Sequence, residues 1–233
     1  MQTNAIPWGK LLRRLVSYYE RGDWRVPVLR HRGGNPFLVL VSTILSHRTR
    51  DEVTERATLR LLAHFPTPAA MAKATVSDIE PLVREVGLSQ RKARGLVDAA
   101  KFLVSEHEGR VPRTLKELLE IPRVGPKTAH AILVFGYSKP GLPIDSHILR
   151  VCRRLGATTA SNISDAQDDL MNIMPSTYWG LMNPILVQHG MNTCQHENPH
   201  CDKCPIIQWC GRTGLTSRET VGSTDQTSKD IWS

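Results

Sequence analysis

The stretch LLEIPRVGPKTAHAIL, residues 118–133, places a short turn between two apolar segments of helical periodicity. Pro122, Gly125 and Pro126 interrupt regular structure there, because proline fixes φ and removes a donor while glycine tolerates unusual backbone conformations. A long cation, Lys127, follows at once, in the first turn of the second segment, where the helix dipole already places positive partial charge. The stretch therefore predicts two short helices joined by a tight turn that presents a lysine.

Helical periodicity dominates the rest of the chain, and no Asn-Gly or Asp-Gly hairpin lies between alternating segments, so the sequence predicts an all-α fold. Asn35 followed by Pro36 is typical of a helix start. Ser77 is expected to cap a short helix that ends at Gly87. The expected helical segments are 8–22, 35–51, 51–65, 75–87, 89–112, 113–121, 127–137, 143–156, 164–175 and 176–190.

The composition favours a polyanionic partner. The 233 residues include 30 Lys and Arg against 22 Asp and Glu, a formal charge of +8, which makes nucleic acid the first expected partner and an anionic membrane the second. No stretch approaches the roughly 18 apolar residues of a membrane span, and the N-terminus has no signal-peptide pattern. Residues 213–233 are polar and rich in Ser and Thr, which predicts a flexible tail.

The turn itself has two interpretations. Backbone N–H groups at Val124 and Gly125, with the start of the second helix, could bind a phosphate group, as in a helix–hairpin–helix that grips a DNA backbone. The alternative is a purely structural turn between packed helices. Burial and the helix N-terminus are both expected to lower the pKa of Lys127, which would make its amine a nucleophile able to form a Schiff base. The alternative for Lys127 is a surface phosphate contact.

Asp145 lies 18 positions after Lys127, at the start of another expected helix. Its carboxylate could stabilise a developing sugar cation or accept a proton. Aspartate before a helix is also an ordinary N-cap, which contributes about 1 kcal/mol. Both roles are compatible, because a capping side chain is held rigidly.

Four of the five cysteines follow the spacing C-x6-C-x2-C-x5-C at Cys194, Cys201, Cys204 and Cys210. The pattern is typical of a metal or cluster site in a reducing compartment, and with one C-x2-C pair it favours a [4Fe–4S] cluster over zinc. Zinc stays possible with help from the histidines at 196 and 200. The remaining cysteine, at 152, is expected to be a buried apolar residue.

A hairpin ending in G-x-K-T-A, an aspartate after a Gly/Pro segment and the 6–2–5 cysteine spacing together resemble the endonuclease III family. These are base-excision DNA glycosylases of the helix–hairpin–helix–GPD superfamily, and the resemblance runs from about Leu29 to Cys210. It implies a two-lobed all-α fold. The implied domains are a six-helix barrel at 29–139, a cluster domain built from 1–28 and 140–212, and the tail at 213–233.

The resemblance also implies the chemistry. Lys127 would attack the sugar of a flipped, oxidised pyrimidine, with Asp145 assisting, and a Schiff base would lead to β-elimination and a nick 3′ to the abasic site. The expected partner is duplex DNA carrying a damaged base or abasic site, and the protein is expected to act as a monomer without a membrane partner. If its source is prokaryotic, the expected location is the cytoplasm, in association with the nucleoid. The four clustered cysteines would hold the [4Fe–4S] cluster.

The resemblance also implies that two loops contact DNA. Leu88 matches the family's wedge, which fills the gap left by base flipping, although a core leucine is the alternative. Arg48 stands where the family has a glutamine facing the orphan base, and its donors favour guanine there. Arg123 replaces the first hairpin glycine and adds a phosphate contact. The DNA-binding residues implied are Arg48, Leu88, Arg123, Val124, Gly125 and Thr128.

Two other functions remain open at this point. A relative of the same superfamily would remove thymine or uracil opposite guanine, which Arg48 permits and Lys127 disfavours, since such enzymes can lack the lysine. A non-catalytic DNA-binding module would use the hairpin and a structural metal only, and would not need Lys127.

Overall fold

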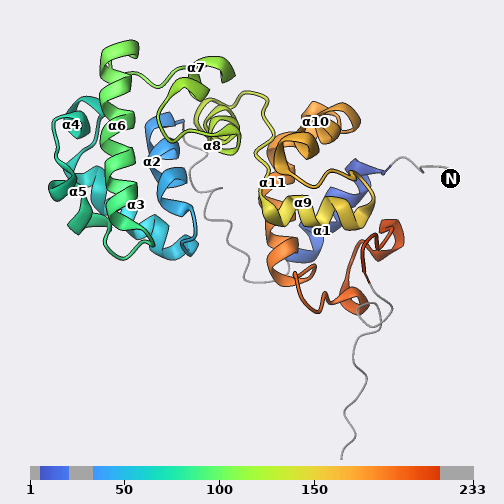
Figure 1. Ribbon diagram of the computed structural model, residues 1–233. Coiled ribbons are helices and arrows are strands. Elements are labelled where there is room, and N and C mark those ends of the chain that lie inside the picture. Colours follow the sequence, from blue (N-terminus) through green and yellow to red (C-terminus); the bar gives the residue numbers. More distant parts are fainter. Residues whose placement is uncertain (1–5, 21–33, 216–233) are drawn as a thin grey trace, which may run out of the picture. The chain divides into compact units, whose positions relative to one another are not determined.

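The computed structural model describes residues 6–20 and 34–215, and every regular element within them is helical (Figure 1). The predicted all-α fold is therefore confirmed. Across these residues no helix is long and apolar enough to cross a membrane. The helices are α1 (Trp8–Glu20), α2 (Pro36–Ser46), α3 (Asp51–His64), α4 (Pro68–Ala72), α5 (Val76–Val83), α6 (Ser89–His107), α7 (Leu115–Glu120), α8 (Pro126–Ala131), α9 (Ser146–Leu155), α10 (Ile163–Ile173) and α11 (Trp179–Asn192).

The chain divides into two compact units. The hairpin unit is the described part of 24–144 together with Met174–Pro184, and the cysteine unit is α1, Asp145–Ile173 and the described residues from Ile185 on. Helix α11 changes unit at Pro184. The division assigns 140–144 and 174–184 to the hairpin unit, whereas the predicted domain boundary lay at 139. Residues 216–233 of the predicted tail, which begins at 213, lie outside the described residues.

Local capping signals were only partly predicted. Asn35 caps α2 as expected, since its side chain accepts from the N–H groups of the second and third helical residues. The predicted cap at Ser77 is wrong. Thr75 caps α5 instead, in a reciprocal capping box with Asp78, which satisfies one more orphan donor than a lone serine could. The helix also ends at Val83, before the predicted stop.

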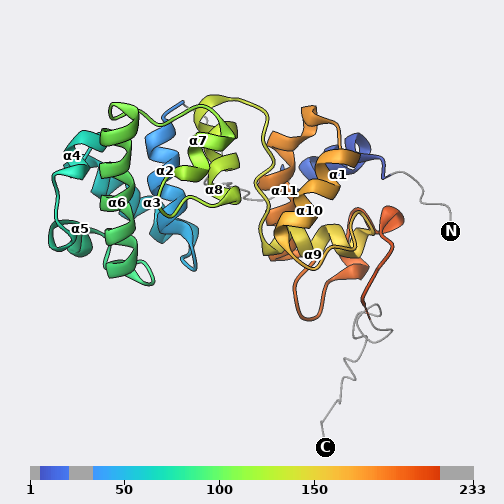
Figure 2. The same ribbon diagram turned by 45° about the horizontal axis from the view of Figure 1, so that its top comes forward.

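Helix α6 is central to the hairpin unit and contacts α2, α4 and α5 (Figures 1 and 2). Its buried face includes Leu96, Ala100 and Leu103, each at most 1% exposed. Helix α4, a single short turn of helix started by Thr67 and Pro68, was missed because five residues are too few to show a periodicity.

A π-helical turn at Ile132–Gly136 continues α8 and packs on the start of α2. A Cβ added to Gly136 would lie 2.8 Å from Pro36 Cα, a backbone atom that cannot move aside alone. We therefore expect Gly136→Ala to lower the free energy of unfolding by about 1–3 kcal/mol, as overpacking does. Gly125→Ala is the matched control, because an added Cβ there meets nothing within 4 Å. Equal effects of the two substitutions in urea unfolding would contradict the packing described.

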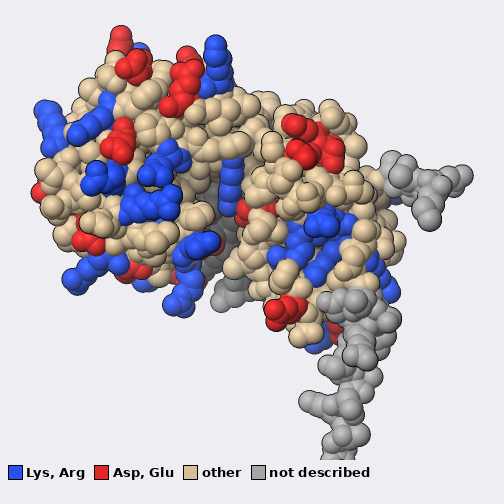
Figure 3. All heavy atoms as spheres, viewed as in Figure 1, with Lys and Arg blue, Asp and Glu red and all other residues tan. Residues whose placement is uncertain are grey.

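The cysteine unit is built on α1, α9, α10 and the second half of α11. The predicted buried face of α1 is confirmed, with Leu11, Leu12 and Leu15 at most 1% exposed, and Ile148 of α9 is fully buried. Figure 3 shows groups of Lys and Arg side chains on the viewed face of each unit, in agreement with the net positive charge.

Candidate functional site: a lysine hairpin and a cysteine pocket

Helices α7 and α8 form the predicted hairpin. The Val124 N–H donates to Ile121 O at 3.0 Å, so this group closes the turn, and its predicted role as an anion donor remains a prediction. Arg123 has φ of 69°, in the left-handed region that glycine adopts without penalty. Arg123 stands where the hairpin of the resembled family has its first glycine. Its backbone nevertheless adopts the left-handed conformation that glycine favours.

The Arg123 side chain is exposed and its stem lies over α6. A Cβ added to Gly95 would come within 2.9 Å of Arg123 Cγ, so the missing side chain at 95 makes room for the arginine. A glycine inside a helix costs about 1 kcal/mol relative to alanine, and the position of Arg123 provides a packing reason for glycine here. This long-range pair could not be read from either stretch alone.

Lys127 is the second residue of α8, as the sequence predicted. Its side chain is exposed, so the predicted burial is wrong. The prediction used only the position of the lysine in its helix, and that position does not determine which groups cover it.

Asp145 lies half-buried at the N-cap of α9, where its Oδ1 accepts from the N–H groups of His147 at 3.0 Å and Ile148 at 3.1 Å. The predicted capping role is confirmed. Two backbone donors fix the carboxylate in one orientation. Lys127 belongs to the hairpin unit and Asp145 begins the cysteine unit.

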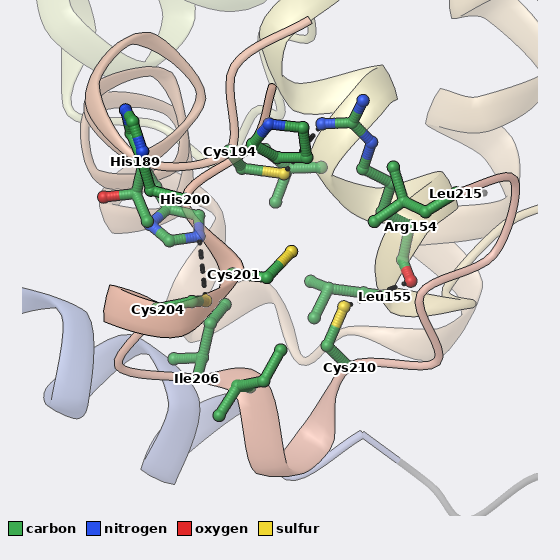
Figure 4. A pocket seen from close by; sticks show the side chains of 14 residues that line it. Arg154, Leu155, His189, Cys194, His200, Cys201, Cys204, Ile206, Cys210 and Leu215 are labelled. Atoms are coloured by element: carbon green, nitrogen blue, oxygen red, sulfur yellow. Dashed lines mark hydrogen bonds between the residues drawn. The ribbon is translucent and has the colours of Figure 1, made fainter. Parts of the chain in front are cut away.

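Cys194, Cys201, Cys204 and Cys210 line one pocket of the cysteine unit (Figure 4). The other walls are mainly apolar and include Val151, Leu155, Ile206 and Leu215. Burial raises the pKa of the Cys204 thiol to about 12 and also raises the pKa values of two of the other three thiols, those at 201 and 210. The free thiolates are thus disfavoured, and a bound cation would stabilise them.

Two buried polar side chains, Arg154 and His189, contact sulfur atoms of the pocket. Arg154 is only 8% exposed and donates through Nη1 to Cys194 Sγ at 3.4 Å. His189, which is 1% exposed, brings Nε2 to 3.7 Å from Cys204 Sγ (Figure 4). Its Nδ1 lies 2.9 Å from the Tyr19 hydroxyl. Both contacts of the His189 ring are hydrogen bonds if Tyr19 donates to Nδ1 and Nε2–H donates to the Cys204 sulfur. Nothing in the spacing of the cysteines pointed to Tyr19 or His189.

The sulfur atoms do not already form a closed site for one ion. Among the described residues, no group of three or more His, Cys, Asp or Glu side chains is arranged to hold a metal ion. His200 lines the pocket but His196 does not. Cys152 is fully buried and outside the pocket lining, as expected for an apolar role.

The Arg48 and Leu88 loops both use left-handed backbone, with φ of 54° and 60°. Both side chains are exposed, and the 53% exposure of Leu88 excludes the core-leucine alternative. Sequence reasoning missed Lys92, a lysine 6% exposed that lies between these loops. It also missed His130, whose Nδ1 accepts the Leu142 N–H at 3.1 Å and whose pKa is lowered by burial.

Residues 41–176 match the family of HhH-GPD superfamily base excision DNA repair proteins. Endonuclease III of Thermotoga maritima is 37% identical over 201 residues, which cover 86% of this chain and 91% of that protein. A solved structure of a trapped endonuclease III–DNA covalent intermediate, with an estranged adenine, has a TM-score of 0.75 at 26% identity and covers 88% of this chain and 94% of its own. A thermostable thymine-DNA glycosylase has a TM-score of 0.78 over 88% of this chain and 95% of its own, but its 21% identity supports the fold alone.

The all-helical fold, the lysine hairpin and the extent of these matches lead to one conclusion: this chain belongs to the helix–hairpin–helix–GPD superfamily of base-excision DNA repair proteins, with endonuclease III among its relatives.

Proposed function

We propose that this chain is a bifunctional DNA glycosylase and abasic-site lyase of base-excision repair, with Lys127 as its nucleophile. The observation that carries the proposal is Lys127 in the first turn of the second hairpin helix, in a chain 37% identical to an endonuclease III. The non-catalytic module is not supported, because such relatives are enzymes. The mismatch glycosylase is also not favoured, because the likeness to a thymine-DNA glycosylase extends only to the fold.

In the proposed reaction, Lys127 Nζ attacks C1′ of the flipped nucleotide. The bond from C1′ to the base breaks, its electron pair leaves with the base, and the base takes up a proton. The nitrogen then loses a proton, the C1′–O4′ bond breaks and O4′ takes up a proton, so that a Schiff base joins Lys127 to the opened sugar. Removal of a C2′ proton expels the 3′ phosphate and nicks the strand. Lys127 is exposed in the protein alone, so in this proposal the bound DNA covers it during the reaction.

Asp145 provides the charge in this proposal. Its carboxylate, held by two backbone N–H groups, is suited to stabilising positive charge on the sugar and to moving the proton of the amine.

We propose that the exposed arginine of the hairpin, Arg123, binds a DNA phosphate. Its replacement by glycine preserves the left-handed turn and removes one charge. We expect affinity for duplex DNA to fall about tenfold at low salt, whatever the sequence, and the slope of log K against log salt to decrease by about 1. Arg110→Ala is the matched control, since Arg110 is also exposed in the hairpin unit. A similar loss of affinity in that control would contradict a specific contact.

The proposed substrate is an oxidised pyrimidine in a duplex, with Leu88 as the wedge and Arg48 facing the orphan base. The exposure of both side chains supports this. Arginine offers donors only, which favours guanine, whose O6 and N7 accept. Excision measured on thymine glycol, G·T and G·U duplexes tests this. Release from G·T alone would move the assignment to the mismatch activity, and release from none would refute the proposed function.

We propose that Cys194, Cys201, Cys204 and Cys210 hold a [4Fe–4S] cluster. All four cysteines line one pocket, and their spacing contains a single C-x2-C pair, which favours a cube that binds one thiolate at each iron over a zinc site with two such pairs. When bound, the cluster would organise the loop around it, and the proposed excision does not involve it.

The cluster assignment predicts that Cys204→Ala lowers iron and sulfide from about four per chain toward zero, with loss of the visible absorption of the cluster. Cys152→Ala is the control, because that thiol is buried outside the pocket and should leave the iron content unchanged. One zinc per chain and no sulfide in the wild-type protein would contradict the assignment.

A further inference from the structure

Lys92 is a buried lysine in the first turn of α6, with only 6% of its surface exposed. Its Nζ donates to Leu45 O at 2.7 Å and to Thr49 Oγ1 at 2.8 Å. Both acceptors are neutral, and burial lowers the pKa of the Lys92 ammonium to about 8. Lysine is rarely buried, because desolvation of the ammonium is unfavourable. The burial of Lys92 therefore calls for an explanation other than packing.

The bonds of Lys92 join two loops that are far apart in sequence. Leu45 is in the last turn of α2, and Thr49 follows Arg48 in the connection to α3. The Lys92 N–H donates to Leu88 O at 3.0 Å, so the same residue is attached to the Leu88 turn by its backbone and to the Arg48 loop by its side chain. The two loops also approach each other closely, since a Cβ added to Gly87 would lie 3.3 Å from Arg48 O.

Both loops adopt a conformation that has to be held. Arg48 and Leu88 are non-glycine residues in the left-handed region, a conformation that persists only where the surrounding structure holds it. Each presents an exposed side chain. Lys92 touches the loops from the buried side, where it can fix them without contacting DNA.

We infer that Lys92 is a positioning residue that fastens the Arg48 loop to the Leu88 turn, so that the two side chains enter DNA as one rigid pair and set the choice of opposite base. The inference rests on the proposed function, in which these residues occupy the gap left by the flipped base. Lys92 is not a second nucleophile, because its Nζ is buried and held by two acceptors.

The test is single-turnover excision of thymine glycol placed opposite each of the four bases, in the intact protein. Lys92→Met keeps the apolar stem and removes both bonds. We expect the ratio of rates between the best and worst opposite base to fall at least fivefold. A merely structural role would lower the active fraction equally on all four duplexes and leave the ratio unchanged, which would overturn the inference.

Two further variants complete the test. Lys101→Met makes the same change at an exposed position of α6 and should preserve the ratio. Arg48→Ala should remove most of the discrimination, and adding Lys92→Met should reduce it no further, because both changes act on one loop. Independent, multiplying effects on the ratio would overturn the inference. If the wild-type protein excised the base with no opposite-base preference, the inference about Lys92 would be overturned but the glycosylase and lyase activity would stand. If the wild-type protein excised nothing, the proposed function itself would be refuted.

Discussion

Replacement of Lys127 by alanine is expected to lower the single-turnover rate of base excision by at least about 10³ and to abolish nicking of abasic DNA. The physical reason is that the amine supplies both the attacking electron pair and the nitrogen of the Schiff base. The alanine side chain can do neither. Because Lys127 is exposed, its removal should leave the melting temperature of the protein nearly unchanged.

Lys116→Ala is the matched control for this result. Lys116 is an exposed lysine on the first helix of the same hairpin, so its loss changes the charge equally. We expect it to retain excision and nicking within a few-fold. If the two variants lost activity to the same extent, Lys127 would be a phosphate contact and the nucleophile would have to be sought elsewhere.

Replacement of Asp145 by asparagine is expected to lower the excision rate by about 10²–10⁴, the range that a positioned acid–base group contributes. Asparagine is as good an N-cap as aspartate, so its Oδ1 can still accept from the two N–H groups that start α9. The substitution therefore removes the negative charge while the helix keeps its cap. Stability against urea should change little.

Asp145→Ala separates the two roles of this residue. It removes the charge and the cap together, so it should match Asp145→Asn in activity and also lose about 1 kcal/mol of stability. Wild-type excision by the asparagine variant would contradict the account and leave Asp145 as a structural cap only.

Features with local signals were predictable from the sequence. The Asn35 cap, the buried face of α1 and the Asp145 cap each depend on residues within one or two helical turns. The clustering of four cysteines in one pocket was also predictable, since a short loop cannot spread them far apart. The Thr75 cap was mistaken for Ser77 because two capping residues stand close together and only the reciprocal bond to Asp78 decides between them.

Features that depend on contacts between distant segments were not predictable. In the sequence, Lys92 looks like any other cation of an amphipathic helix. Its hydrogen bonds to Leu45 and Thr49 are visible only in the structure. Gly95 reads as a weak point of α6 until Arg123 is found against it. The predicted burial of Lys127 was wrong for the same reason, because a local stretch of sequence does not show which segments cover a side chain.

Lys127 is expected to become covalently attached to the sugar during excision. The most direct test is to reduce a reaction on thymine-glycol DNA with borohydride, digest the adduct with nuclease and protease, and locate the modified residue by mass spectrometry. We expect a sugar remnant on Lys127 and on no other lysine. Modification of a different residue, or base release with no adduct, would contradict it.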